Sequence, residues 1–357
     1  MRILVTGASG FVGRHVTDLL SYDHNLVTPS RKELDLLEMN SWNEGFVAHN
    51  GGKAFASWIS DEEYDNGKID AIIHLAATVG GIGANKENPG RFIYENLQMG
   101  INVLEGARLA KVQKVVMLGT VCMYPKHTPV PFKEEDIWNG YPEETNAPYG
   151  IAKKAVLEMG RAYHRQYGLD VTNLVPVNMA GEYDNFSPDS SHVIPAIITK
   201  FENPRRATRR EPCKCQCHKP GSQMMHVMAC CDKDGLVRGA KEINAIELWG
   251  TGNASREFLY AGDCARAIAI ALEKNTGPEP INIGTGREIS IAKLADMIKR
   301  VGGYDSEIAW DATKPDGQPR RCLDISRAKS VLRWEPKVDL EEMVRRSIDW
   351  YRSNKTS

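Results

Sequence analysis

The sequence lacks an excess of charge of either sign: 45 Lys and Arg residues against 46 Asp and Glu residues give a formal net charge of -1. Binding to nucleic acid or to an anionic membrane surface through charge needs basic clusters. Long apolar runs are also lacking, since the apolar stretches are only as long as a strand, whereas a membrane-spanning helix needs about 20 residues. We therefore expect neither nucleic acid nor a membrane among the partners.

We expect no secretory leader either. Residues 1–5 already show a strand pattern, whereas a leader begins with a basic segment and a longer apolar segment. The hydrophobic content of 42% and the charged content of 25% are ordinary for a globular protein. These features predict a cytoplasmic protein whose 357 residues form one large domain or two intertwined ones.

The eight cysteines are unevenly distributed, because five of them lie between residues 213 and 231. Cytoplasmic cysteines are mostly reduced. Cys213, Cys215 and Cys217, with the later pair Cys230 and Cys231, supply enough thiolates for a tetrahedral zinc site. Their spacing differs from the usual Cys-x-x-Cys pairs. A flexible loop with reduced thiols is therefore the favoured interpretation over a zinc site, and we predict no metal.

A glycine-rich turn separates the first strand pattern from a helical pattern that runs to residue 20. Glycines at this position permit a tight turn and a close approach to the pyrophosphate of a dinucleotide, which binds at the helix N-terminus. The spacing is Gly-x-x-Gly-x-x-Gly, and an ordinary turn between strand and helix is the alternative. The cofactor-binding residues predicted here are Gly7, Gly10, Phe11, Val12 and Gly13.

The second strand pattern, residues 25–29, is followed by Ser30 and Arg31 and not by Asp or Glu. An acid at this point binds the ribose 2′-hydroxyl of NAD, whereas Arg pairs with the 2′-phosphate of NADP. The sequence therefore favours NADP, with Asp35 and Leu36 near the adenine. Arg31 as a solvated surface charge is the alternative.

The third strand pattern, residues 71–77, ends in Leu75, Ala76 and Ala77 and leads into a glycine-rich loop at residues 78–83. Ligands of open α/β sheets bind at the carboxyl ends of the strands, and small side chains there let the backbone approach the cofactor. We count these three residues as cofactor-binding. His74, inside the strand pattern, is interpreted as structural and not catalytic.

Tyr149 and Lys153 form a Tyr-x-x-x-Lys pair, and this spacing places both on one face of a helix. A neighbouring ammonium favours the phenolate and lowers the Tyr pKa from about 10, which suits proton exchange with a carbonyl or an alcohol. Thr120 follows a strand pattern at residues 114–118 and offers a hydroxyl to the same substrate oxygen. A solvated helix face is the alternative for the pair.

Strand and helix patterns alternate up to residue 177, which predicts an α/β fold with a doubly wound parallel sheet. We expect residues 1–177 to form an NADP-binding Rossmann domain. Residues 178–357 then form a smaller, mixed substrate domain, with segments around 256–284 returning to the first and a cysteine-rich insertion at about 205–243. Residues 40–68 are interpreted as an extended surface connection, and residues 178–186 and 191–195 as loops.

Several stretches give the chain a family resemblance: residues 79–82, 118–126, 145–149, 163–168, 184–186, 191–195, 249–258 and 314–317. With the glycine turn and the Tyr-x-x-x-Lys pair, they resemble the extended short-chain dehydrogenase/reductase family. Within it, the chain is similar to the epimerase–reductases that act on GDP-4-keto-6-deoxy sugars. The stretches span nearly the whole chain.

The resemblance implies roles for individual residues. Thr120, Tyr149 and Lys153 match the reductase triad, with Lys153 also on the cofactor ribose, and Cys122 and His192 match the acid–base pair of epimerisation. The residues implied to hold the GDP-sugar are Asn178, Lys200, Trp249, Arg256 and Lys314.

The implied reaction is NADPH-dependent C3/C5 epimerisation through an enediolate, followed by reduction at C4. The long helical patterns at residues 89–110 and 149–167 fit a homodimer interface or packing within the chain.

The triad has Thr120 where the family usually has Ser. Alternatives are a C4 reductase or an epimerase with half of this chemistry, and a regulatory NADP-binding protein without activity. The intact triad argues against the last.

Overall fold

A computed structural model describes residues 1–37, 51–60, 68–188, 190–209, 241–314 and 316–355. Its largest element is a six-stranded parallel sheet with the strand order β10-β5-β4-β3-β1-β2. The strands are β1 (Arg2–Thr6), β2 (Asn25–Val27), β3 (Ala71–His74), β4 (Lys114–Leu118), β5 (Asp170–Pro176) and β10 (Ile281–Ile283). Among these residues, no helix is long and apolar enough to cross a membrane.

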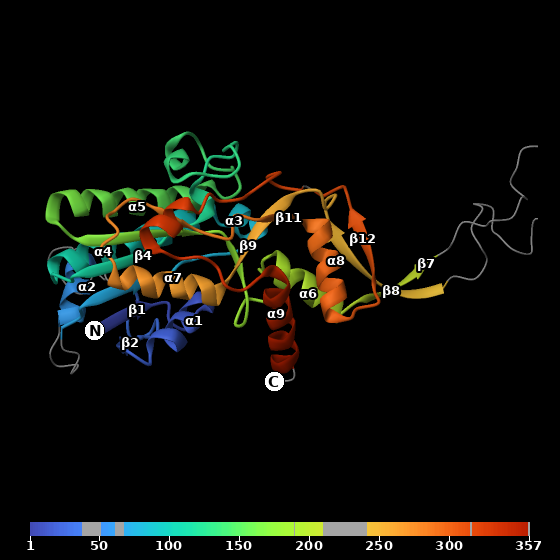
Figure 1. Ribbon diagram of the computed structural model, residues 1–357, viewed down its shortest axis with the longest axis horizontal. Coiled ribbons are helices and arrows are strands. Elements are labelled where there is room, and N and C mark those ends of the chain that lie inside the picture. The colour runs from blue at the N-terminus through green and yellow to red at the C-terminus, as the bar shows by residue number, and fades with distance from the viewer. Residues whose placement is uncertain (38–50, 61–67, 189, 210–240, 315, 356–357) are drawn as a thin grey trace, which may run out of the picture.

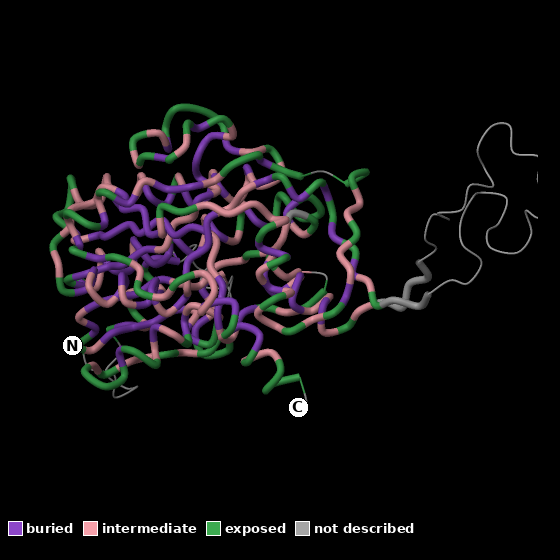
Figure 2. Tube along the Cα trace, turned by 45° about the vertical axis from the view of Figure 1, so that its right-hand side comes forward, coloured by how far each residue is buried: buried purple, intermediate pink, exposed green. Residues whose placement is uncertain are grey.

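Both faces of this sheet are covered, because successive strand residues point to opposite sides and both sets are apolar. Ile3 and Val5 of β1 join the core with α1 (Phe11–Leu20) and α7 (Ala261–Glu273). Leu4 between them joins the core with α2 (Gly51–Ser60), α4 (Pro89–Leu109) and α5 (Ala147–Tyr167). The doubly wound parallel sheet predicted from the sequence is therefore confirmed, and Figure 2 shows the buried residues concentrated in it.

Helix α2 corrects the interpretation of residues 40–68 as an extended connection. Phe55 and Ile59, one turn apart, are buried against α4. A Cβ on Gly106 of α4 would clash with the Phe55 ring, so the glycine permits the close approach of the two helices. The apolar stripe of α2 has too few residues to stand out as a periodic pattern, which explains the error.

The second half of the chain forms two smaller sheets around a third core. One has the order β11-β9-β6 and the other β12-β8-β7. Figure 1 shows them beside the parallel sheet, together with the helices of this half. The elements are β6 (Asn178–Ala180), α6 (Val193–Glu202), β7 (Arg205–Arg209), β8 (Lys241–Trp249), β9 (Ser255–Tyr260), β11 (Glu288–Ser290), α8 (Ile291–Gly302), β12 (Glu307–Asp311) and α9 (Leu340–Asn354).

Two segments expected to be loops contain regular structure. Residues 178–180 form β6, which pairs with β9, and α6 begins at Val193, inside the stretch 191–195. Both are short apolar pieces next to polar loop residues, so neither shows a clear period. Residues 205–209 and 241–245, the ends of the predicted insertion, form an antiparallel pair. The cysteine cluster at 213–231 lies outside the described residues.

The chain crosses between the cores more than once. After β9 it returns to the parallel sheet with α7 and β10, and residues 323–334 also contribute to that core. The remaining short elements are α3 (Ile82–Glu87), 3-10 turns at Val121–Met123 and Glu134–Trp138, and a π-helical turn at Ala328–Leu332. The boundary at residue 177 between two domains stays a prediction.

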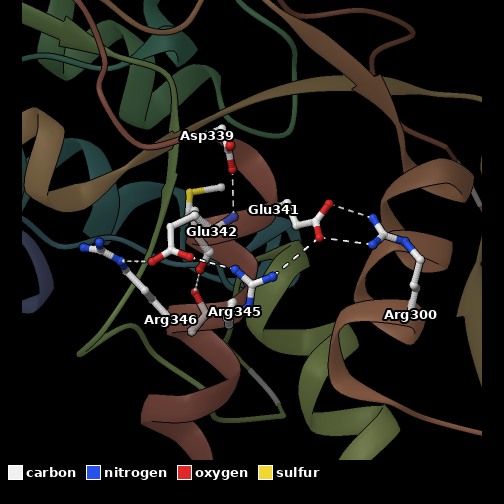
Figure 3. A network of polar contacts seen from close by, with 8 residues as sticks. Arg300, Asp339, Glu341, Glu342, Arg345 and Arg346 are labelled. Carbon is white, nitrogen blue, oxygen red and sulfur yellow. Dashed lines mark hydrogen bonds and ion pairs between the residues drawn. The ribbon is translucent and has the colours of Figure 1, made fainter.

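Charged residues tie α9 to α8 at the surface of the second half (Figure 3). Arg300 of α8 donates two hydrogen bonds, of 3.1 and 2.8 Å, to the carboxylate of Glu341. Asp339 caps α9 by accepting from the Glu342 N–H at 2.8 Å, and Arg346 donates to Glu342 at 2.9 Å. Exposed pairs of this kind each contribute at most about 1 kcal/mol, so they orient the helix more than they stabilise it.

Candidate active site

A cleft of about 490 Å³ lies at the carboxyl ends of β1, β3 and β4. The order of the strands reverses here, because β2 and β3 lie on opposite sides of β1, and ligands of such folds bind at this point. Many of the predicted residues line the cleft: Gly7, Gly10, Phe11, Val12, Gly13, Arg31, Asp35, Leu36, Leu75, Ala76, Ala77, Thr120, Cys122, Tyr149, Lys153, Asn178 and His192.

The glycine turn forms one wall. Gly7 has a φ of +73°, and a Cβ there would lie 2.7 Å from the Ala76 backbone nitrogen, so glycine is required for both conformation and space. Gly10 is the N-cap of α1 and provides no side-chain cap. The first N–H groups of α1 therefore lack a side-chain acceptor at the cap, and a helix terminus of this kind binds phosphate. These features fit a dinucleotide pyrophosphate.

Arg31 stands at the edge of this wall, four residues before Asp35. Its Nε donates to Asp35 Oδ2 at 3.0 Å, and its side chain is 69% exposed. Asp35 Oδ1 accepts from the Leu37 N–H at 2.9 Å. The Asp35 carboxylate is thus fixed by the backbone and holds the guanidinium beside the cleft.

His74 occupies a buried position below the cleft. Its Nδ1 lies 2.8 Å from the Thr6 hydroxyl oxygen. Burial, assisted by the charge of Lys153, lowers the pKa of His74 to about 3. The imidazole is therefore neutral at physiological pH and links β1 to β3, in agreement with the structural interpretation.

Helix α5 brings Tyr149 and Lys153 to the turn that follows β4. A Cβ on Gly150 would clash with the Cys122 carbonyl oxygen, so glycine lets the start of α5 contact this turn. Lys153 Nζ donates to the Leu118 carbonyl oxygen at 3.1 Å, and the Tyr149 ring packs edge-on against Phe92, with centroids 6.5 Å apart. The backbone of β4 thus orients the Lys153 ammonium.

The predicted effect of Lys153 on the Tyr149 phenol is wrong. The pKa of Tyr149 is raised above its usual value, mainly by burial and further by the charge of Cys122, while a hydrogen bond with Thr120 acts in the opposite direction. Burial lowers the pKa of Lys153 to about 8. Desolvation therefore dominates, and Tyr149 keeps its proton at neutral pH. A neutral phenol suits the donation of a proton to a carbonyl oxygen.

Cys122 and His192 reach the cleft from different parts of the chain. Cys122 lies in the 3-10 turn after β4, and its N–H donates to Thr120 Oγ1 at 3.2 Å. His192 is the N-cap of α6. Although part of His192 is exposed, desolvation lowers the pKa of its imidazole below the ordinary value. The cleft thus holds a thiol and an imidazole next to the phenol of Tyr149.

The other residues predicted to bind substrate do not line this cleft. Lys200 Nζ donates to the Glu247 carbonyl oxygen on β8 at 2.6 Å. Trp249 is 64% exposed, and Lys314 Nζ lies 5.6 Å from its ring centroid. Arg256 Nη1 donates to the Ser255 carbonyl oxygen at 2.7 Å, and burial lowers the pKa of Arg256 to about 10. Their roles stay predictions.

Two residues near the cleft escaped the sequence analysis. Asn85, which is 3% exposed, lines the cleft and donates from Nδ2 to the Gly80 and Gly81 carbonyl oxygens. Arg321 Nη1 lies 3.9 Å from Cys122 Sγ. Asn85 follows the glycine-rich loop at residues 78–83, and this position could have indicated that it lies near the cleft. Arg321 is 199 positions from Cys122, and no local pattern predicts their contact.

The parallel sheet, the glycine turn and the Thr120–Tyr149–Lys153 group define a Rossmann-type oxidoreductase. The family model described as NAD dependent epimerase/dehydratase family matches residues 3–284, and the model of GDP-mannose 4,6 dehydratase matches residues 236–347. The chain belongs to the NAD dependent epimerase/dehydratase family.

Individual relatives agree with the resemblance drawn from the sequence. GDP-L-fucose synthase 1 of Arabidopsis thaliana is 35% identical over 99% of this chain and 94% of its own. A GDP-6-OMe-4-keto-L-xylo-heptose reductase from C. jejuni has a TM-score of 0.77 at 27% identity, covering 99% of this chain and 97% of its own. The GDP-mannoheptose C4 reductase MlghC from Campylobacter jejuni, solved with NADP bound, has a TM-score of 0.73 at 27% identity, covering 98% of both chains.

Proposed function

We propose that this protein is an NADP-dependent epimerase–reductase of a GDP-4-keto-6-deoxy sugar, similar in activity to the GDP-L-fucose synthases. The observation that carries the proposal is one cleft that contains the glycine turn, the proton donor Tyr149, and the pair Cys122 and His192. Reduction alone needs only the first two, whereas the additional acid–base pair serves epimerisation. Bound NADPH supplies the hydride for C4.

In the reductive step, Tyr149 and Thr120 hold the C4 oxygen of the sugar. Because Tyr149 is neutral, its phenol donates a proton to that oxygen as the carbonyl is reduced. The Lys153 ammonium stabilises the negative charge that develops on Tyr149, since a cation near a phenol favours the phenolate. Leu118 keeps the ammonium in place through its carbonyl oxygen.

In epimerisation, the C4 oxygen is bound by the same two hydroxyl groups, those of Tyr149 and Thr120. The 4-keto group acidifies the hydrogens on C3 and C5, and the removal of one gives an enediolate whose charge Tyr149 and Thr120 stabilise. Inversion requires a base on one side of the ring and an acid on the other. Cys122 from the β4 turn and His192 from the N-terminus of α6 provide these two groups.

The nucleotide end of the substrate is assigned to the second half of the chain. Arg256 and Lys314 suit an anionic diphosphate, and Trp249 offers an aromatic surface for a base or a sugar. Asn178 lines the cleft and Lys200 lies on α6, the helix that begins next to His192. We place the sugar in the cleft and the diphosphate toward Arg256.

The test is incubation with NADPH and GDP-4-keto-6-deoxymannose, followed by NMR of the product. We expect oxidation of NADPH and a GDP-6-deoxyhexose inverted at C3 and C5. The second candidate, a plain GDP-sugar C4 reductase, is favoured by the similarity to MlghC. In that case the product is reduced at C4 without inversion.

The position of Arg31 predicts a preference for NADPH over NADH. Its guanidinium lies beside the cleft after β2, where it pairs with a 2′-phosphate. Replacing Arg31 with Ala should raise the KM for NADPH about tenfold and leave the KM for NADH nearly unchanged, since one charge-assisted contact contributes about 1.5 kcal/mol. Steady-state kinetics with both cofactors checks this, and equal losses would contradict the assignment.

A homodimer and a cytoplasmic location complete the proposal. Tyr94 and Ile101 of α4 are 59% and 40% exposed, and their spacing of seven places them on one helix face. Exposed apolar side chains on a shared face suit a partner subunit. We expect light scattering to give the mass of a dimer, and Tyr94→Glu with Ile101→Glu to give a monomer. A matched change at the exposed Tyr22, just after α1, should leave the mass unchanged.

A further inference from the structure

The segment from Asp316 to Asp324, in the second half of the chain, brings Arg321 to Cys122 and is fixed at several points. Asp316 accepts hydrogen bonds from the Thr251 N–H and hydroxyl, both at 2.7 Å. The Leu323 N–H donates to the buried carboxylate of Glu257 at 2.6 Å. Phe132 exchanges backbone hydrogen bonds with this segment, which pairs it with the loop after β4. Arg321 therefore projects from a well-anchored backbone.

The Arg321 side chain is held by Gln318. Arg321 Nε donates to Gln318 Oε1 at 2.6 Å, and Gln318 Nε2 donates to the Lys126 carbonyl oxygen at 2.7 Å. Gln318 is only 7% exposed. Because Lys126 belongs to the same loop as Cys122, this amide fixes the guanidinium relative to the thiol. Arg321 Nη1 then lies 3.9 Å from Cys122 Sγ.

The charge of Arg321 is not neutralised by an acid. Within the part of the chain that the structure describes, no carboxylate forms an ion pair with Arg321, whereas its neighbour Arg320 pairs with Glu288. Arg256 lies close enough to Arg321 for the two guanidinium groups to repel each other. An anion beside them is therefore favoured, and the Cys122 sulfur lies within hydrogen-bonding reach of Arg321.

We propose that Arg321 is a positioning residue for Cys122, which it holds in the thiolate form by hydrogen-bonding and opposite charge. This inference rests on the proposed function, in which Cys122 exchanges a proton with the sugar. The thiolate takes the proton from the carbon next to the 4-keto group and becomes a thiol. The electron pair of the broken C–H bond passes into the enediolate. The imidazolium form of His192 then gives a proton to the opposite face and becomes the neutral imidazole. A hydrogen bond from a guanidinium favours the thiolate over the thiol.

The first experiment measures the thiol without any sugar, on protein saturated with NADP. The alkylation rate of Cys122 by iodoacetamide is followed against pH by mass spectrometry of its peptide. In Arg321→Met, the pH of half-maximal rate should rise by about one unit, since an opposite charge within about 4–6 Å has an effect of this size. Arg321→Lys keeps the positive charge but loses the planar guanidinium group. It should therefore shift the pH of half-maximal rate by less than Arg321→Met does.

Arg320→Met is the matched control, because it removes a neighbouring guanidinium that pairs with Glu288 and not with Cys122. A variant that only changes the access of iodoacetamide to Cys122 alters the maximal alkylation rate. It does not alter the midpoint, the pH at which the rate is half-maximal. A midpoint in Arg321→Met that equals that of Arg320→Met, or lies below it, overturns the proposal. Thermal melting of each variant confirms that the midpoint belongs to folded protein.

The second experiment follows deuterium incorporation into the keto sugar from deuterium oxide. Arg321→Met should slow incorporation at least about tenfold at pH 7 relative to Arg320→Met, and Arg321→Lys should restore part of it. A rise only in the KM for the GDP-sugar, with normal incorporation at saturation, makes Arg321 a phosphate contact and overturns the proposal. If the wild type incorporates no deuterium, the proposed epimerisation fails, while the alkylation midpoint still decides whether Arg321 acts on Cys122.

Discussion

Replacing Tyr149 with Phe should slow NADPH-dependent reduction by about 10²- to 10⁴-fold, the usual contribution of a positioned acid or base. In the proposed function the phenol is the proton donor for the C4 oxygen, and its raised pKa keeps it protonated at neutral pH. Phe retains the ring that packs against Phe92, so the fold and the affinity for NADPH should persist. Stopped-flow absorbance of NADPH measures the rate, and fluorescence titration measures the affinity.

Tyr163→Phe is the matched control for this variant. Tyr163 lies on the same helix, and its hydroxyl donates to Glu105 at 2.9 Å, away from the cleft residues. Its loss should cost only about 1 kcal/mol of stability and leave the rate of reduction unchanged. Near-normal hydride transfer in Tyr149→Phe, or an equal loss in Tyr163→Phe, would remove Tyr149 from the reaction.

The pKa of Lys153 gives the pH dependence of the same step. Burial lowers the pKa of Lys153 to about 8. Lys153 is therefore fully protonated well below pH 8 and loses its charge as the pH rises through this value. Single-turnover reduction should therefore be fastest near neutral pH and decline above about pH 8. A rate that instead increases through pH 8 would contradict a role for the Lys153 charge.

The residues that line the glycine-turn side of the cleft were predictable because their signals are local. Gly7, Gly10 and Gly13 stand directly between a strand and a helix, and the backbone geometry of such a turn admits little else. Residues 75–77 were predictable for the same reason, as the end of an apolar strand. In a parallel sheet, all such ends lie at one edge, so the sequence order alone brings them together.

What the sequence did not reveal depends on contacts between distant segments. Helix α2 was missed because its stability comes from Phe55 packing onto α4 at Gly106, which no local pattern reports. The pKa of Tyr149 was misjudged because spacing gives the nearness of Lys153 but not the depth of burial. The contact of Arg321 with Cys122 depends on Gln318 and on the anchoring of residues 316–324.

Single variants at Cys122 and His192 should separate epimerisation from reduction. Neither residue donates the proton to the C4 oxygen, so Cys122→Ser and His192→Gln should still oxidise NADPH with the keto sugar. Each should slow deuterium incorporation at C3 and C5 at least about 10²-fold, because each removes the base or the acid on one face of the ring. NMR of the product should then show an unepimerised or partly epimerised 4-hydroxy sugar.

The controls for these variants are Cys264→Ala and His164→Gln. Cys264 is a buried residue of α7, and His164 Nδ1 lies 3.0 Å from the Leu169 carbonyl oxygen at the far end of α5. Both should incorporate deuterium as the wild type does. Loss of NADPH oxidation in Cys122→Ser and His192→Gln to the level of Tyr149→Phe would contradict the separation of the two steps. If the wild type consumes NADPH without incorporating deuterium at either carbon, the enzyme is a C4 reductase, and Cys122 and His192 serve binding or packing.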